Sequence, residues 1–179
     1  MKTILGLSGS LRRRSYNSGL LRAAVELAPD GVRIETGSIR DVPLYDGDRE
    51  EAEGLPQPVL RLQEQLRAAD GLLLVTPEYN NGIPGVFKNA IDWMSRGDGL
   101  EIFAGKPVAI TGASDGGFGT ILAQAHWLPV LRTLKTRHWQ EGRMRVSRAP
   151  DLFDEDGNLT DERQRRILRR FVEDFARSL

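Results

Sequence analysis

The chain contains no cysteine among its 179 residues. Disulfides, thiol nucleophiles, thiolate zinc sites and iron–sulfur clusters are therefore excluded. It has only two histidines, His126 and His138, which are too few and too far apart to suggest a transition-metal site. Neither sign of charge is in excess, because 25 basic residues balance 25 acidic ones. This balance favours neither nucleic acid nor a membrane surface as a partner.

Long hydrophobic runs are also lacking. The first apolar stretch, TILGL at residues 3–7, is too short for a signal peptide or a membrane span, and no later stretch reaches membrane length. We therefore expect a cytoplasmic location and no membrane partner. The length fits one domain with a substantial core, which we place at residues 1–179.

The local exception to the even charge is a basic segment at residues 132–148. It holds six cations against Glu141; they are Arg132, Lys135, Arg137, Arg143, Arg145 and Arg148. A solvated face is the simpler interpretation, and attraction of an anionic substrate is the alternative.

Strand-like and helix-like patterns alternate along the chain. Strand patterns lie at residues 3–8, 31–37, 71–76, 106–112 and, weakly, 136–140. Helical patterns lie at residues 17–28 and 58–69, after Pro84, at 119–134 with a kink at Pro129, and from about Thr160; residues 39–57 read as loop. The expected inward faces include Leu20, Leu21, Ala24, Val25 and Leu27 early, and Ile167, Leu168, Phe171, Val172 and Phe175 late. This order predicts an α/β sandwich whose parallel sheet binds its ligand beyond the carboxyl ends of the strands.

The loop after the first strand, SGSLRRRSYNSG at residues 8–19, offers hydroxyls, an amide and a helix N-terminus. Such a terminus binds phosphate through its free N–H groups, and Arg12 could add a charge-assisted bond. Helix capping by Ser15 or Asn17 accounts for one residue but not for the set. Because the motifs G-x-x-x-x-G-K-[ST] and G-x-G-x-x-G are both absent, the loop suits a single terminal phosphate better than a pyrophosphate.

Two further loops follow the third and fourth strands. A tight turn explains the glycines and proline of TPEYNNGIPG, residues 76–85, but not Glu78, Tyr79 and Asn80 together. Backbone N–H groups there could reach the edge of a planar heterocycle, with Tyr79 beside it. In GASDGGFG, residues 112–119, four glycines allow close approach and positive φ.

The third loop also matches G-x-S-x-G, the nucleophile elbow of serine hydrolases, with Ser114 as the nucleophile. A triad there needs an acid and then a histidine after the serine. The only acid between Ser114 and His126 is the adjacent Asp115, and no acid separates His126 from His138. A serine hydrolase is therefore a remote alternative.

The segments GSLRRRSYN, PEYNNGIPGVFKNAIDW and GASDGGFG resemble those of the NAD(P)H-dependent FMN reductases, in the branch of bacterial quinone and chromate reductases. The likeness spans nearly the whole chain, and the second segment is the most specific. The resemblance implies a flavodoxin-like three-layer sandwich with five parallel strands, non-covalent FMN, NAD(P)H as co-substrate, and a homodimer or homotetramer. Thr120 and Leu122 depart from it, since relatives often carry a second glycine and an arginine there.

The resemblance also assigns residues to the FMN. By motif, Ser10, Arg12, Ser15 and Asn17 would hold its phosphate, Pro77, Glu78, Tyr79 and Asn80 would border the isoalloxazine, and Ser114 and Gly116 would approach it. The implied activity is hydride transfer from NAD(P)H to flavin N5 and onward to quinones or similar small acceptors such as chromate, azo compounds or free flavin. The chemistry lies on the cofactor, and no catalytic side chain is assigned. A flavin-binding electron carrier or redox sensor is the alternative, although ordinary flavodoxins are strongly acidic and this chain is neutral.

Overall fold

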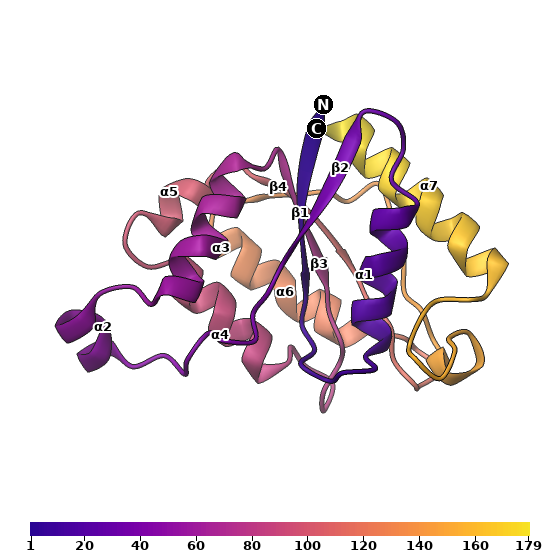
Figure 1. Cartoon of the computed structure of the whole chain (residues 1–179), viewed down its shortest axis with the longest axis horizontal. Coiled ribbons are helices and arrows are strands. Elements are labelled where there is room, and N and C mark those ends of the chain that lie inside the picture. Colours follow the sequence, from indigo (N-terminus) through magenta and orange to yellow (C-terminus); the bar gives the residue numbers. More distant parts are fainter.

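The computed structural model describes all 179 residues, and it forms three layers with a parallel sheet in the middle (Figure 1). The strands are β1 (Lys2–Ser8), β2 (Val32–Gly37), β3 (Gly71–Val75), β4 (Pro107–Thr111) and β5 (Arg137–His138). The helices are α1 (Tyr16–Glu26), α2 (Gly47–Glu53), α3 (Gln57–Ala68), α4 (Gly85–Met94), α5 (Gly99–Phe103), α6 (Ile121–Thr133) and α7 (Glu162–Ser178), with a 3₁₀ turn at Ala149–Asp151. The predicted fold class is confirmed.

The strands are all parallel and lie in the order β2-β1-β3-β4-β5. This is the flavodoxin-like order, which reverses direction between β1 and β3. The connections that leave β1 and β3 therefore run in opposite directions and open a crevice at the carboxyl edge of the sheet. The loops after β1, β3 and β4 lie at this edge, which we call the rim. No helix has the length and apolarity needed to cross a membrane.

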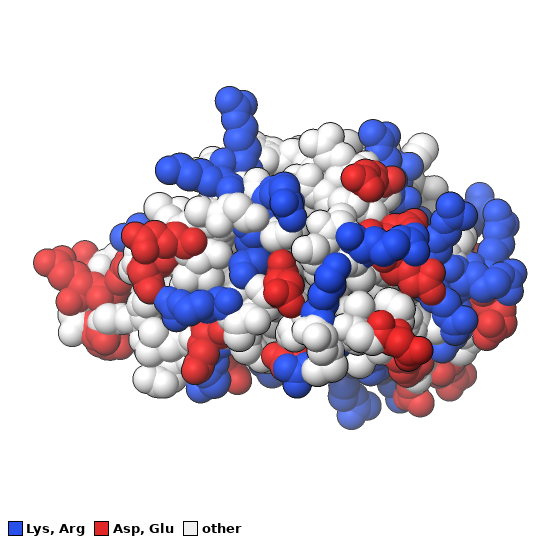
Figure 2. All heavy atoms as spheres, turned by 90° about the horizontal axis from the view of Figure 1, so that it is seen from above, with Lys and Arg blue, Asp and Glu red and all other residues white.

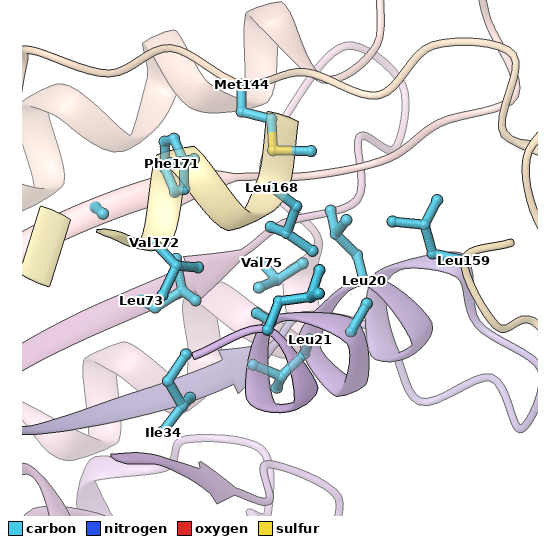
Figure 3. Packing of buried hydrophobic residues seen from close by; sticks show 14 of the residues in the cluster. Leu20, Leu21, Ile34, Leu73, Val75, Met144, Leu159, Leu168, Phe171 and Val172 are labelled. Atoms are coloured by element: carbon cyan, nitrogen blue, oxygen red, sulfur yellow. The ribbon is translucent and has the colours of Figure 1, made fainter. Parts of the chain in front are cut away.

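Two separate cores cover the two faces of the sheet, because successive strand side chains point to opposite faces. One core joins Ile4 and Leu73 to α1 and α7, and Figure 3 shows Leu20 of α1 beside Leu168 of α7 there, with Val172 of α7 next to Leu73 of β3. The other core joins alternate strand residues such as Leu5, Leu72 and Leu74 to α3, α4 and α6. This double cover explains why the strands read as continuous apolar runs.

The prediction that Val25 and Ile167 face the core was wrong. Val25 of α1 and Ile167 of α7 are 39% and 41% exposed, whereas the neighbouring Ala24 and Leu168 are buried. Successive helical residues are rotated by about 100°, which places Val25 and Ile167 beyond the edge of the buried stripe of their helices.

The prediction of loop at residues 39–57 was partly wrong, because α2 lies within it. Its N-cap is Asp46, whose carboxylate accepts from the Asp48 N–H at 3.0 Å. The helix has no buried residue, so it carries no apolar periodicity that the sequence could reveal. It projects from the body in Figure 1, and Figure 2 shows acidic side chains gathered at that end. The short α5 was likewise not predicted.

Smaller differences occur at element ends. Pro84 is the N-cap of α4 rather than its first residue, and β5 contains only two residues of the predicted five. Pro129 lies inside α6, as the sequence indicates. These shifts leave the placement of the three loops at the rim unchanged.

Candidate functional site

All ten residues that the sequence singled out line one groove of about 530 Å³ at the rim. They come from three loops: Ser10, Arg12, Ser15 and Asn17 from the first, Pro77, Glu78, Tyr79 and Asn80 from the second, and Ser114 and Gly116 from the third. The structure also adds Tyr16, Asn81, Ala113, Asp115, Gly117, Phe118 and Gly119 to the lining. Each added residue lies within one of the three loops that the sequence singled out. The sequence did not predict which further residues of those loops face the groove.

The first loop leads directly into the N-terminus of α1. Ser15 is its N-cap, and the Ser15 hydroxyl accepts from the Ser18 N–H at 3.3 Å. The N–H groups of Tyr16 and Asn17, in the first turn, have no partner within the helix. Capping and an anion-binding terminus are thus compatible, because Ser15 satisfies only one of the free donors.

Two arginines of this loop differ in their surroundings. Arg12 is exposed and forms no ion pair. Its guanidinium carbon lies over the Tyr16 ring, 5.9 Å from the ring centroid. Arg14 instead approaches the Asp156 carboxylate, with 3.7 Å between Nε and Oδ1. Arg12 is therefore the cation with an unneutralised charge at the groove.

Asn17 connects the first loop to the third. Its side-chain oxygen accepts from the Ala113 N–H at 2.9 Å, and its side-chain nitrogen donates to the Ala113 carbonyl at 2.9 Å. The side chain is 4% exposed. Its amide is thus engaged with backbone, and what Asn17 can offer a phosphate is its own N–H.

The second loop contains a tight two-residue turn. Tyr79 and Gly82 exchange backbone hydrogen bonds of 3.1 and 3.0 Å, while Asn80 and Asn81 have φ of 50° and 63°. Positive φ at both central positions defines a type I′ turn, for which asparagine is well suited. The turn leaves the Tyr79 side chain half exposed at the groove.

Glu78 caps a helix from a distant part of the chain. Its Oε2 accepts from the N–H groups of Leu122 and Ala123 at 2.8 and 2.9 Å. Thr120, the N-cap of α6, makes no side-chain capping bond of its own. A carboxylate at a helix N-terminus is favourable, so Glu78 fixes the second loop against α6.

The third loop is held by its own polar groups. The Ser114 hydroxyl donates to the Gly119 carbonyl at 2.6 Å, and its N–H donates to the Val146 carbonyl at 3.0 Å. A Cβ on Gly112 would lie 1.9 Å from the carbonyl oxygen of Thr76, so only glycine fits there. Of the four glycines, only Gly119 has positive φ. The expectation of positive φ was therefore correct for one glycine, and close approach explains Gly112.

The geometry around Ser114 does not support a nucleophile. Neither His126 nor His138 lines the groove, so no imidazole can take the serine proton. The hydroxyl instead donates to a carbonyl of its own loop. The arrangement lacks the base that a Ser–His pair requires.

Comparison with known proteins gives consistent relationships. The model of the NADPH-dependent FMN reductase family matches residues 2–151. The chain is 47% identical over 165 residues to the NAD(P)H-dependent FMN reductase PA1204 of Pseudomonas aeruginosa, covering 92% of this chain and 88% of that one. It is 39% identical over 168 residues to the 2-hydroxy-1,4-benzoquinone reductase of a Burkholderia species, covering 94% and 91%.

Among solved structures, FerB, a flavoenzyme NAD(P)H:(acceptor) oxidoreductase from Paracoccus denitrificans, superposes with a TM-score of 0.87 at 35% identity. The superposition covers 99% of this chain and 96% of that chain. The family match covers well over half of the sequence, and the fold and the three loops agree with it. The chain belongs to the NADPH-dependent FMN reductase family.

Proposed function

We propose that this protein is an NAD(P)H-dependent, FMN-containing oxidoreductase that reduces quinones and similar small acceptors. The observation that carries the proposal is the single groove at the switch point of the sheet, which gathers all three loops. The names of the Pseudomonas and Burkholderia relatives support flavin and quinone reduction. Bound FMN would supply the chemistry, taking hydride from NAD(P)H and passing electrons to the acceptor.

The residues present fit a ligand with one phosphate. The first turn of α1 offers unpartnered N–H groups, and the hydroxyls of Ser10 and Ser15 lie beside them in the groove. Arg12 brings a positive charge that no carboxylate of the protein neutralises. These groups would bind the phosphate dianion by charge-assisted hydrogen bonds.

The other end of the groove fits a flat ring. The second and third loops present backbone, a half-exposed Tyr79 and a pair of glycines, Gly116 and Gly117. Backbone N–H groups of the loop that holds Tyr79 would orient the ring and favour negative charge on it. We assign no catalytic side chain, and the proposed part of the protein is to bind and orient the cofactor.

The proposal also covers the range of electron acceptors, the oligomeric state and the cellular location, which the groove does not determine. Chromate, azo compounds and free flavin are further acceptors that the sequence resemblance suggests. Assembly as a homodimer or homotetramer and a cytoplasmic location are also expectations of the sequence.

The proposal is tested by purifying the protein and identifying any bound chromophore after release. We expect FMN, and steady-state NAD(P)H oxidation that depends on an added quinone. Failure to bind FMN even after incubation would refute the proposal. Bound FMN with almost no turnover would favour the electron-carrier alternative.

The phosphate contact is tested by comparing Arg12→Ala with Arg14→Ala. Arg12 has no carboxylate partner, whereas Arg14 approaches Asp156. A charge-assisted bond to phosphate is worth roughly 1.5–3 kcal/mol, so Arg12→Ala should raise the FMN Kd by about tenfold or more. Equal effects of the two substitutions, measured by fluorescence titration of the apoprotein, would contradict the contact.

A further inference from the structure

A second cavity, of about 660 Å³, lies between α6 and the segment that follows β5. It is larger than the groove at the rim, and the two share no lining residue. Its lining includes much of the basic segment at residues 132–148. The proposed function uses none of these residues.

The charges around this cavity have one sign. Arg132, Lys135, Arg143 and Arg145 line it, and no aspartate or glutamate does. None of the four takes part in an ion pair, so no neighbouring carboxylate neutralises their charges. Positive charges around one concave surface raise the local concentration of anions.

The remaining wall is apolar. Leu131 and Trp139 are buried beneath the cavity, and Ile121 and Leu128 expose 40% and 44% of their surface. The Trp139 indole N–H is buried and has no hydrogen-bond acceptor. His138 adds a polar edge, and partial burial lowers its pKa. The cavity thus combines an apolar wall with a cationic rim.

The backbone at Lys135 supports a role for its charge. Lys135 has φ of 55° just after α6, where the Thr136 N–H returns to the Leu131 carbonyl at 3.1 Å. Glycine is the residue that this helix-ending position favours, because it adopts positive φ without a steric cost. A lysine here sacrifices stability and brings an ammonium group to the cavity.

We propose that this cavity is a second binding site, for an organic anion that has a flat apolar body and a sulfonate, carboxylate or phosphate group. The apolar body would lie on Leu131, Leu128 and Ile121. The anionic group would lie among the arginines and Lys135. The site is separate from the flavin groove and does not depend on it.

The test uses the FMN-loaded protein and naphthalene-2-sulfonate as the probe, with binding measured by calorimetry. We expect a Kd below about 1 mM that weakens as salt is added. Neutral naphthalene-2-sulfonamide and inorganic sulfate each lack half of the required chemistry, and both should bind at least about fivefold more weakly. No binding of the sulfonate, or equal binding of the sulfonamide, would overturn the proposal.

Matched variants locate the probe. The double substitution Arg143→Gln and Arg145→Gln should raise the Kd by about fivefold to tenfold, because each removes one unpaired charge at the cavity. Arg166→Gln and Arg169→Gln remove the same charge from the exposed face of α7 and should change it less than about twofold. Equal effects of the two pairs would show that the probe responds only to net charge, which also overturns the proposal.

Discussion

Replacing Asn17 with alanine removes two buried hydrogen bonds that hold the first loop of the groove to the third. Both bonds are 2.9 Å long and go to one residue, Ala113. Asn17 is 4% exposed, so water cannot readily replace the lost partner. Each of the two backbone groups left unsatisfied costs about 1–3 kcal/mol, so Asn17→Ala should lower the free energy of unfolding by about 2–6 kcal/mol.

The substitution should also weaken FMN binding. If the loops are no longer fixed before the ligand arrives, binding must order them, and this cost appears in the affinity. We expect the FMN Kd to rise by about tenfold or more, which corresponds to about 1.4 kcal/mol. Urea denaturation measures the stability, and fluorescence titration of the apoprotein measures the Kd.

Asn89→Ala is the matched control. Asn89 makes the same kind of bonds, accepting from the Tyr45 N–H at 2.9 Å and donating to the Pro43 carbonyl at 2.8 Å, but it does not line the groove. It should lower stability and leave the FMN Kd within about twofold. The reasoning fails if Asn17→Ala costs less than about 0.5 kcal/mol, or if both substitutions weaken FMN binding equally.

Two more predictions concern the capping carboxylate of Glu78 and the half-buried His138. Glu78→Ala leaves the Leu122 and Ala123 N–H groups without their acceptor and should cost about 1–2 kcal/mol by urea denaturation, with Glu78→Gln in between; an Ala variant as stable as the natural chain would show that this cap contributes nothing. Burial lowers the pKa of His138, so the unfolded chain takes up this proton more readily, and the stabilisation present above about pH 6.5 is lost as the pH falls toward the folded pKa. Between about pH 8 and about pH 5.5, which bracket that transition, the free energy of unfolding should therefore fall less for His138→Gln than for the natural chain. Identical pH profiles would contradict this assignment.

Much of the site followed from sequence because its parts are local. The apolar runs of β1, β3 and β4 are continuous since both faces of the sheet are covered, and each run is followed at once by an unusual loop. Parallel strands bring their carboxyl ends to one edge, so three loops far apart in sequence had to converge. The ten predicted residues accordingly line one groove.

What the sequence could not give is which partner each polar side chain takes. Asn17 bonds to Ala113, 96 residues away, and Glu78 caps a helix that starts more than 40 residues later. Neither pairing leaves a spacing or periodic signal, because each depends on how loops from different strands meet.

The chain by itself thus determined the sheet, the rim and the residue types that gather there, since periodicity and turn chemistry act between near neighbours. Only the tertiary structure decided which side chains face a ligand and which hold the loops, as Arg12 and Asn17 illustrate. It alone also closed the basic segment onto α6 to form the second cavity. The physical reason is that burial and long-range hydrogen bonds are properties of packed surfaces, which exist only once the layers have met.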